Sequence, residues 1–232
     1  MKNILLIGGS YGIGLAIAKQ LQFENNVFIA SRSNENLADI EATYITFDAS
    51  TDVLDTSKLP SVIDGLVYCP GSINLRPFKG IKPETFEADL QINFISLVKV
   101  IQSVLPNLLA SEQASIVTFS SVAASMGMPF HTSVSASKGA IEGFAKALAA
   151  EYAPKIRVNV IAPSLTDTPL ADKFLNNETK QEKSAERHPL KRFGKPEDSA
   201  QMACFLLSDK SSWISGQIFH VDGGMSTLLV NG

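Results

Sequence analysis

The segment Ile4-Leu5-Leu6-Ile7-Gly8-Gly9-Ser10-Tyr11-Gly12-Ile13-Gly14 opens the chain and decides its fold. Its four consecutive apolar residues predict a strand buried on both faces, and the apolar periodicity of residues 15–21 predicts a helix directly after the glycines. Glycines at such a turn allow a sharp change from strand to helix and let backbone amides approach a diphosphate closely. This stretch therefore predicts a strand–turn–helix unit that binds a nucleotide.

Six further apolar runs follow, separated by longer stretches with helical periodicity. They span residues 27–30, 44–47, 66–68, 116–119, 158–161 and 218–221. Buried strands that alternate with helices predict a parallel sheet with helices on both faces and right-handed crossovers. We therefore expect an α/β fold: a Rossmann-type doubly wound parallel sheet of about seven strands, in a single domain over residues 1–232. Residues 83–110 have apolar side chains on more than one face, which predicts a buried helix, partly against another subunit.

The composition excludes several classes of protein. The chain is 45% hydrophobic and 19% charged, as in globular domains rather than disordered, collagenous or coiled-coil proteins. Twenty Lys and Arg against 23 Asp and Glu give a net charge of −3, so we expect neither a nucleic-acid partner nor an anionic membrane surface. We find no signal peptide and no run of roughly 20 uninterrupted apolar residues that would span a bilayer. The expected location is therefore cytoplasmic.

Cysteine and histidine placement argues against a metal site. Cys69 and Cys204 are too few for a disulfide scaffold and lack metal-ligand spacing. His131, His188 and His220 form no ligand cluster. The chain also lacks the Gly-x-Ser-x-Gly motif that would suggest a hydrolase.

Further motifs follow the opening glycines, Gly8-x-x-x-Gly12-x-Gly14, in a fixed order along the chain. They are Asn93, Ser120-Ser121, Ser135-Ala136-Ser137-Lys138, Ile156-Arg157-Val158-Asn159, Pro163 to Thr168, Phe193-Gly194 and Val221-Asp222-Gly223-Gly224. Together they resemble the short-chain dehydrogenase/reductase family over nearly the whole chain. The resemblance implies hydride transfer between a nicotinamide cofactor and a carbonyl or alcohol carbon.

The end of the second predicted strand should select the cofactor. An acid there would hydrogen-bond the ribose 2′-hydroxyl of NAD and repel a 2′-phosphate, but this chain has Ser31 and Arg32. A guanidinium offers paired donors to phosphate oxygens, so we favour NADP(H) over NAD(H). The alternative is a solvated arginine at a strand end. Asp48 matches the position that contacts adenine in the family, or it is a turn aspartate.

The resemblance completes the predicted cofactor site. Gly71 keeps the close backbone approach, although Tyr68-Cys69-Pro70 replaces the usual Asn-Asn-Ala, and Ser164 stands where the family usually has glycine. Thr166 and Thr168 match positions near the carboxamide and the phosphates. The full set is Gly8, Ser10, Tyr11, Gly12, Ile13, Gly14, Ser31, Arg32, Asp48, Gly71, Lys138, Pro163, Thr166 and Thr168.

The resemblance also implies four catalytic residues, of which three are present. Ser121 would polarise the carbonyl oxygen, and Asn93 would order a proton-relay water. Lys138, expected in the first turn of its helix, would hold the nicotinamide ribose and lower the pKa of a tyrosine four residues earlier. Position 134 is instead valine, which cannot exchange a proton.

Loss of the phenol leaves two functions open. General acid–base assistance is worth about 10²–10⁴ in rate, whereas holding the reactants together is worth roughly 7–11 kcal/mol. Loss of the phenol would therefore weaken reduction by an NADP(H)-dependent oxidoreductase without necessarily abolishing it. A water between Ser121 and Lys138, or alternatively His131, would then act as the acid. His131 could equally be a plain loop histidine. The alternative is an inactive NADP(H)-binding protein that acts as a sensor or assembly partner.

Two segments bear on the surface and the partners. Residues 171–192 are dense in charge, which predicts either an exposed helix and loop or a mobile flap over a pocket. Small residues on one side of the helix after Val134 permit close approach of its own sheet or of a twin helix. They are Ala136, Gly139, Ala140, Gly143 and Ala147. The resemblance implies a homodimer or homotetramer that acts on a small-molecule carbonyl or alcohol.

Overall fold

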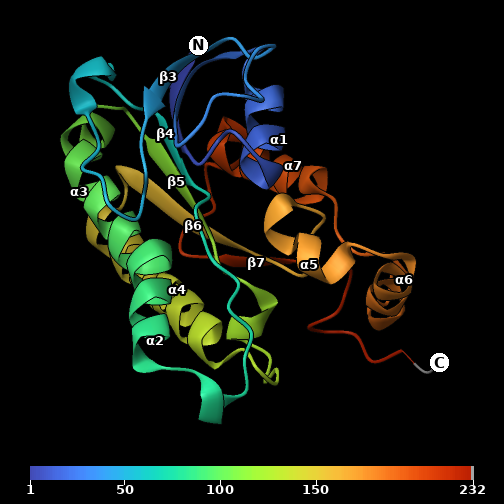
Figure 1. The fold of residues 1–232 in the computed structure, drawn as a ribbon. Helices are drawn as coiled ribbons and strands as arrows, with labels where there is room; N and C mark the ends of the chain where they lie inside the picture. The colour runs from blue at the N-terminus through green and yellow to red at the C-terminus, as the bar shows by residue number, and fades with distance from the viewer. Residues whose placement is uncertain (231–232) are drawn as a thin grey trace.

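The computed structural model describes residues 1–230, with one parallel sheet at its centre (Figure 1). Its order is β3-β2-β1-β4-β5-β6-β7. The strands are β1 (Lys2–Ile7), β2 (Asn25–Ser31), β3 (Ala42–Thr46), β4 (Gly65–Tyr68), β5 (Ala114–Phe119), β6 (Ile156–Pro163) and β7 (Ile218–Val221). The predicted single-domain α/β fold with a seven-stranded Rossmann-type sheet is confirmed. Residues 231 and 232 of the predicted domain lie outside the described residues.

Helices cover both faces of the sheet (Figure 1). The helices α1 (Gly12–Leu21) and α7 (Pro196–Leu207) pack on one face, where they meet Ile4 and Leu6 of β1. On the other face, α3 (Ser96–Leu109) and α4 (Thr132–Tyr152) meet Leu5 and Ile7. Successive β1 side chains thus enter opposite cores, which explains why its last four residues, 4–7, are all apolar. The remaining helices are α2 (Pro83–Leu90), α5 (Asp172–Leu175) and α6 (Glu178–Arg187).

The chain reverses its direction across the sheet between β1 and β4. β1 pairs with β2 on one side and with β4 on the other, all in parallel. Loops at the carboxyl ends of these strands diverge to opposite faces there, so a crevice opens above them. The opening glycine turn follows β1 at this point.

The turn depends on glycine at three of its positions, 8, 12 and 14. Gly8 has φ +79° and Gly12 has φ +53°, a region that L side chains rarely adopt. A Cβ atom on Gly14 would lie 2.2 Å from the carbonyl oxygen of Gly8. The first turn of α1 is thus packed directly against the end of β1.

A π-helical turn interrupts the long central helix that the sequence predicts. It spans Gln91–Ile95, between α2 and α3. Its carbonyl at Ile92 accepts a hydrogen bond of 2.7 Å from the hydroxyl of the buried Tyr68, at the end of β4. Tyr68 therefore ties the sheet to the turn that carries Asn93.

The sequence predicts no membrane-spanning segment, but Pro83–Leu109 is long and apolar enough to cross a bilayer by length and composition. This is weak evidence, because a buried core helix passes the same test. Here Leu97, Val100 and Val104 are buried against the sheet. That packing accounts for the apolar character of the stretch.

Replacing Gly14 with alanine should disrupt the turn. In a helix this change normally stabilises by about 0.5–1 kcal/mol. Overpacking against Gly8 should instead lower the free energy of unfolding by about 1–3 kcal/mol, measured by urea denaturation. Gly80→Ala is the matched control, since a Cβ there meets nothing within 4 Å. Equal stability of the Gly14→Ala variant and the wild type would contradict the close approach.

Candidate active site

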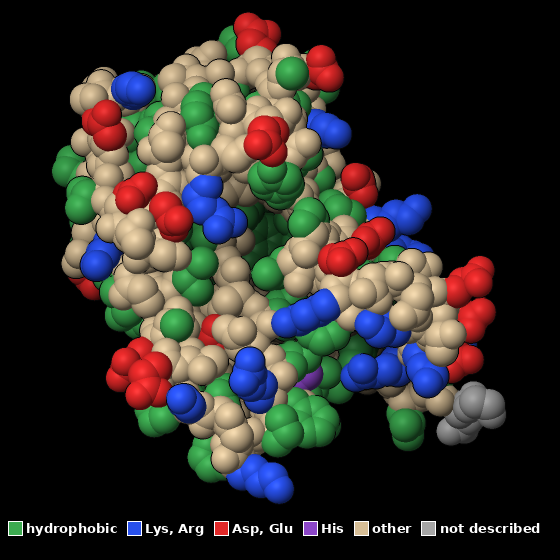
Figure 2. Space-filling model, in the orientation of Figure 1, with side chains coloured by type: hydrophobic (Ala, Val, Ile, Leu, Met, Phe, Trp, Pro, Cys, Tyr) green, Lys and Arg blue, Asp and Glu red, His purple; other side chains and the backbone are tan. Residues whose placement is uncertain are grey.

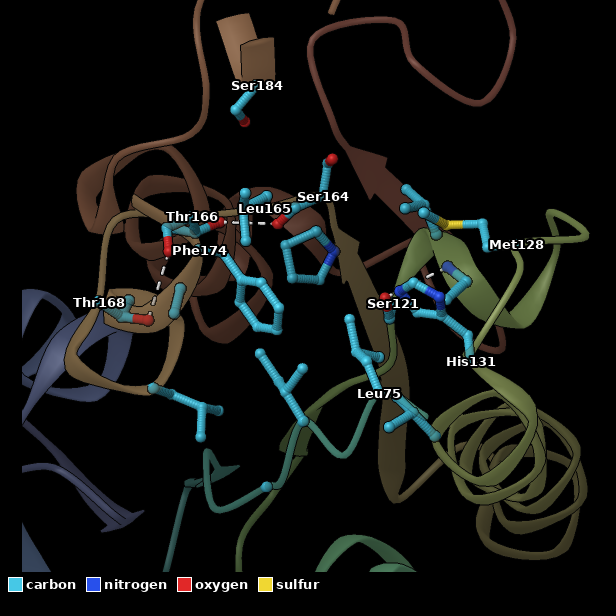
Figure 3. A pocket seen from close by; sticks show the side chains of 18 of the residues that line it. Leu75, Ser121, Met128, His131, Ser164, Leu165, Thr166, Thr168, Phe174 and Ser184 are labelled. Carbon is cyan, nitrogen blue, oxygen red and sulfur yellow. Dashed lines mark hydrogen bonds between the residues drawn. The ribbon is translucent and has the colours of Figure 1, made fainter. Parts of the chain in front are cut away.

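Two adjoining cavities lie at the carboxyl ends of the strands. The glycine-turn cavity, of about 730 Å³, lies over the opening turn and the ends of β2 and β3. The flap cavity, of about 430 Å³, lies between the start of α4 and the segment 168–188, which we call the flap (Figure 3). The two share five lining residues: Ile13, Cys69, Gly71, Thr168 and Leu170. A single extended ligand can therefore occupy both.

Every position of the predicted cofactor site borders one of these cavities. The glycine-turn cavity is lined by Gly8, Ser10, Tyr11, Gly12, Ile13, Gly14, Ser31, Arg32, Asp48, Gly71 and Thr168. Lys138, Pro163 and Thr166 line the flap cavity. The structure thus brings together residues that are up to 160 positions apart in the chain.

The ends of β2 and β3 present a basic and an acidic side chain. Arg32 is exposed, and no ion pair involves it within residues 1–230. Ser31 is buried, and its hydroxyl donates to the carbonyl of Ser33. Asp48 accepts from the amide of Ser50 at 2.8 Å. It is therefore a turn aspartate that also borders the cavity, so both alternatives for Asp48 stay open.

Lys138 lies at the base of the flap cavity. Its side chain is 8% exposed, and Nζ donates to the carbonyl oxygen of Phe119 at 2.9 Å. Burial lowers the pKa of Lys138 to about 8, although the nearby Cys69 and Asp89 act in the opposite direction. Since α4 begins at Thr132, Lys138 lies in its second turn. The prediction that it lies in the first turn is wrong, because the helix starts three residues before the recognised motif.

Val134 occupies the helical position one turn before Lys138. It is 4% exposed and borders the flap cavity. Ser121 lines the same cavity, and its Oγ accepts from the amide of Ala123 at 3.2 Å. Within residues 1–230 the Ser121 hydroxyl donates no hydrogen bond, so its proton is available to a ligand oxygen.

Asn93 lies behind the cavity wall rather than in it. Its Nδ2 donates to the carbonyl of Asp89 and to the hydroxyl of Ser72. A Cβ on Gly71 would lie 3.0 Å from Asn93 Oδ1 and 3.2 Å from Lys138 Nζ. Gly71 is therefore the point where the cavity wall comes close to both polar groups.

Asp89 is a buried carboxylate that the sequence did not single out. It is fully buried, and it accepts from Ser72 Oγ at 2.5 Å, Asn74 Nδ2 at 2.7 Å and Ser133 Oγ at 2.5 Å. These bonds join α2 to the loop after β4 and to the start of α4. In the sequence, only the four-residue spacing from Asp89 to Asn93 indicated that Asp89 lies beside the predicted site.

A second polar group, also not predicted, lies under the flap. His188 is buried, with Nδ1 2.6 Å from the carbonyl of Ser184 and Nε2 2.7 Å from Ser164 Oγ. Nδ1 therefore carries a proton, and in the neutral ring Nε2 accepts from the Ser164 hydroxyl. His131 borders the flap cavity, with Nδ1 2.8 Å from the carbonyl of Pro129. Both interpretations of His131 stay open.

The flap is an exposed helical segment that also lines the cavity, so parts of both predictions for residues 171–192 are met. The mobility of the flap stays a prediction. Its Lys173 Nζ donates to the carbonyl of Ile73, in the loop after β4, at 2.9 Å. Thr166 Oγ1 donates to the carbonyl of Ser164 and Thr168 Oγ1 to that of Thr166 (Figure 3). These bonds hold the entry of the flap against β6. Within residues 1–230, no group of three His, Cys, Asp or Glu could hold a metal ion.

Comparisons with known proteins agree with this geometry. A family model described as "Enoyl-(Acyl carrier protein) reductase" matches residues 8–226. The 3-oxoacyl-[acyl-carrier-protein] reductase FabG of Thermotoga maritima is 33% identical over 241 residues, which cover 97% of each chain. The chain belongs to the short-chain dehydrogenase/reductase family.

Other similar proteins are also oxidoreductases by name. The 2-(S)-hydroxypropyl-CoM dehydrogenase 3 of Xanthobacter autotrophicus is 29% identical over 251 residues, which cover 98% of each chain. A solved short-chain dehydrogenase/reductase from Brucella melitensis, a glucose/ribitol dehydrogenase, has a TM-score of 0.88 at 29% identity. The match covers 97% of this chain and 96% of that one. The short-chain dehydrogenase/reductase assignment thus rests on the whole chain.

Replacing Asp89 with alanine should loosen the wall of the site. One buried and two partly buried donors would lose a charged acceptor, so the free energy of unfolding should fall by about 3 kcal/mol, measured by urea denaturation. The exposed Asp39→Ala is the control and should change stability by less than about 0.5 kcal/mol. A loss no greater than that of the control would show that the network is unimportant.

Proposed function

We propose that the chain is an NADP(H)-dependent oxidoreductase that interconverts carbonyl and alcohol groups by hydride transfer. The observation that carries this proposal is the position of Ser121 and Lys138 in a cavity continuous with the one over the glycine turn. A protein that only binds nucleotide has no need of a free hydroxyl beside the nicotinamide. The named reductase and dehydrogenases among the relatives support the reaction type.

The glycine turn fits the diphosphate of a nicotinamide nucleotide. The Tyr11 side chain leaves the start of α1 uncapped and instead donates to Glu35. The first turn of α1 has no acidic residue, so its amides and the helix dipole favour an anion. Residues 1–232 would then form one NAD(P)-binding domain, with Asp48 beside the adenine.

Arg32 supports NADP(H) over NAD(H). It lines the glycine-turn cavity beside Ser31 and Ser33, and has no competing carboxylate partner among residues 1–230. A guanidinium next to two hydroxyls is well suited to a phosphate on the ribose.

Each polar residue of the flap cavity would have a separate role in the reaction. The nicotinamide nucleotide, when bound, supplies or accepts the hydride. Ser121 would donate a hydrogen bond to the carbonyl oxygen, where negative charge develops during reduction. Lys138 would hold the nicotinamide ribose, and its ammonium would stabilise the same charge. Val134 contributes no proton, so a water between Ser121 and Lys138 would deliver it.

A second function is favoured by Val134 itself. A chain that has lost its proton donor but kept Arg32 and the glycine turn would still bind NADP(H), as a sensor or an assembly partner. The presence or absence of turnover in cofactor-loaded protein separates these two functions.

We also propose a cytoplasmic homodimer or homotetramer. Ala136, Gly143 and Ala147 are exposed on α4, and a Cβ on Gly139 or Gly143 would meet nothing within 4 Å. A second copy of α4 could therefore approach this face closely.

Replacing Arg32 with glutamine should weaken NADPH binding without affecting NADH. Hydrogen bonds to a charged group are worth about 1.5–3 kcal/mol, which corresponds to a rise in Kd of roughly tenfold to a hundredfold. Fluorescence titration of each reduced cofactor measures both constants. The exposed Lys19→Gln on α1 is the control for loss of one positive charge. An equal loss for both cofactors, or none, would argue against a phosphate site at Arg32.

Replacing Val134 with tyrosine should restore the missing acid. We expect kcat for ketone reduction to rise by at least about tenfold, because a positioned general acid contributes about 10²–10⁴. NADPH oxidation with simple ketones and aldehydes provides the measurement.

Wild-type turnover should fall as the pH rises through about 8, because Lys138 then loses its proton.

Val134→Phe is the matched control, since it adds the ring without the hydroxyl. It should give no gain in kcat. If phenylalanine accelerates the reaction as much as tyrosine, the effect is one of packing. If tyrosine gives no gain in a chain that already turns over, another acid is at work.

A further inference from the structure

Helix α6 carries its positive and negative side chains on opposite faces. Lys180, Lys183, Ser184 and Arg187, at i, i+3, i+4 and i+7, all border the flap cavity. Glu178, Glu182 and Glu186 follow at four-residue spacing, which places them on the other face. Figure 2 shows Lys and Arg side chains gathered over this part of the molecule, beside the hollow in its surface.

The stability of the helix explains only part of this arrangement, since Glu178 in the first turn and Arg187 in the last turn suit the helix dipole. The pairs Glu178–Glu182, Glu182–Glu186 and Lys183–Arg187 have four-residue spacing and equal charge, which destabilises an isolated helix. Lys180 lies in the first turn, where the helix dipole disfavours a cation. An anion bound in the cavity would offset the repulsion between Lys183 and Arg187 and the unfavourable position of Lys180.

The flap cavity is basic and has no balancing acid. Its lining includes five cations and, within residues 1–230, no Asp or Glu. Three of the cations already have carbonyl partners: Lys138 with Phe119, Lys173 with Ile73, and Lys180 with Lys173. Neither Lys183 nor Arg187 has a hydrogen-bond or ion-pair partner in the described part of the chain. These two cations are therefore available to a ligand.

The two available cations belong to α6, across the cavity from the proposed reacting groups. Figure 3 shows Ser184 of α6 across the cavity from Ser121 and His131. Apolar side chains, including Leu75, Met128 and Phe174, also line the cavity. The cavity therefore combines the Ser121 hydroxyl, an apolar part of its lining and the cations of α6.

We propose that Lys183 and Arg187 bind an anionic group, a carboxylate or a phosphate, at the end of the substrate remote from its carbonyl. This rests on the proposed function, because Ser121 is taken to bind the carbonyl. Arg187 offers paired donors to two oxygens, and Lys183 adds a second charge. The substrate class is thus a small anionic oxo compound or the corresponding hydroxy compound.

Binding to protein saturated with NADP⁺ tests this without requiring turnover, since the oxidised cofactor carries no hydride. The probes are 4-oxopentanoate and its uncharged methyl ester, titrated by calorimetry. Dihydroxyacetone phosphate and dihydroxyacetone form the second pair and distinguish phosphate from carboxylate. For at least one pair, the anion should bind at least about tenfold more tightly than its neutral partner, a difference of 1.4 kcal/mol. This preference should weaken with added salt.

Variants of α6 assign the preference to its cavity face. Lys183→Gln and Arg187→Gln should each lower the ratio of neutral to anionic Kd by about threefold for a tenfold preference, and the double variant should bring it close to one. Glu182→Gln removes one charge from the opposite face of the same helix and should leave the ratio unchanged. Circular dichroism and the NADP⁺ Kd of each variant report whether the fold and the cofactor site are intact.

The failure of this inference can be distinguished from failure of the proposed function. Equal affinity for the anion and its neutral partner in both pairs, with NADP⁺ bound, overturns the anion site alone. An anion preference that survives the double variant does the same. Absence of NADP⁺ and NADPH binding to the wild type overturns both proposals.

Discussion

The contact between Gly8 and the first turn of α1 is the constraint on which the site depends. No side chain fits there, since a Cβ on Gly14 would lie 2.2 Å from the Gly8 oxygen. The helix therefore starts directly above the carboxyl end of β1, where the strand order reverses. The loops after β4, β5 and β6 rise around the same point, so both cavities open there.

The reacting end is held by buried polar groups rather than by the cavity surface. Lys138 is fixed by the carbonyl of Phe119, and Gly71 lets it lie close to Asn93. Asp89 fixes the loop that carries Gly71 by accepting from Ser72 and Asn74. These bonds are all present with valine at position 134, so the scaffold does not depend on a hydroxyl at that position.

The strands and the glycine turn were predictable from sequence because they depend on local patterns. The strands are rich in apolar residues, and the turn needs glycine. The positions expected to bind a cofactor border the two cavities, and their role stays a prediction. The π-helical turn at Gln91–Ile95 was not predictable, because its residues have ordinary helical propensity and the Tyr68 hydroxyl that bonds it is distant in sequence. In the sequence Asp89 resembles any other helical acid, and only the structure shows that three donors from two separate segments bond to it. The role of α6 emerged only when its orientation toward the cavity was known, since charge alone also fits a solvated face.

The bond from Lys173 to Ile73 joins the flap to the loop after β4. Both residues line the flap cavity, and the bond is exposed to water, where a single hydrogen bond contributes only about 1 kcal/mol. A bond of this strength favours the arrangement in which the two segments stay together, and thermal fluctuations still break it often. The residence time of a bound molecule would then depend on how often the Lys173–Ile73 bond breaks, as well as on the contacts inside the cavity.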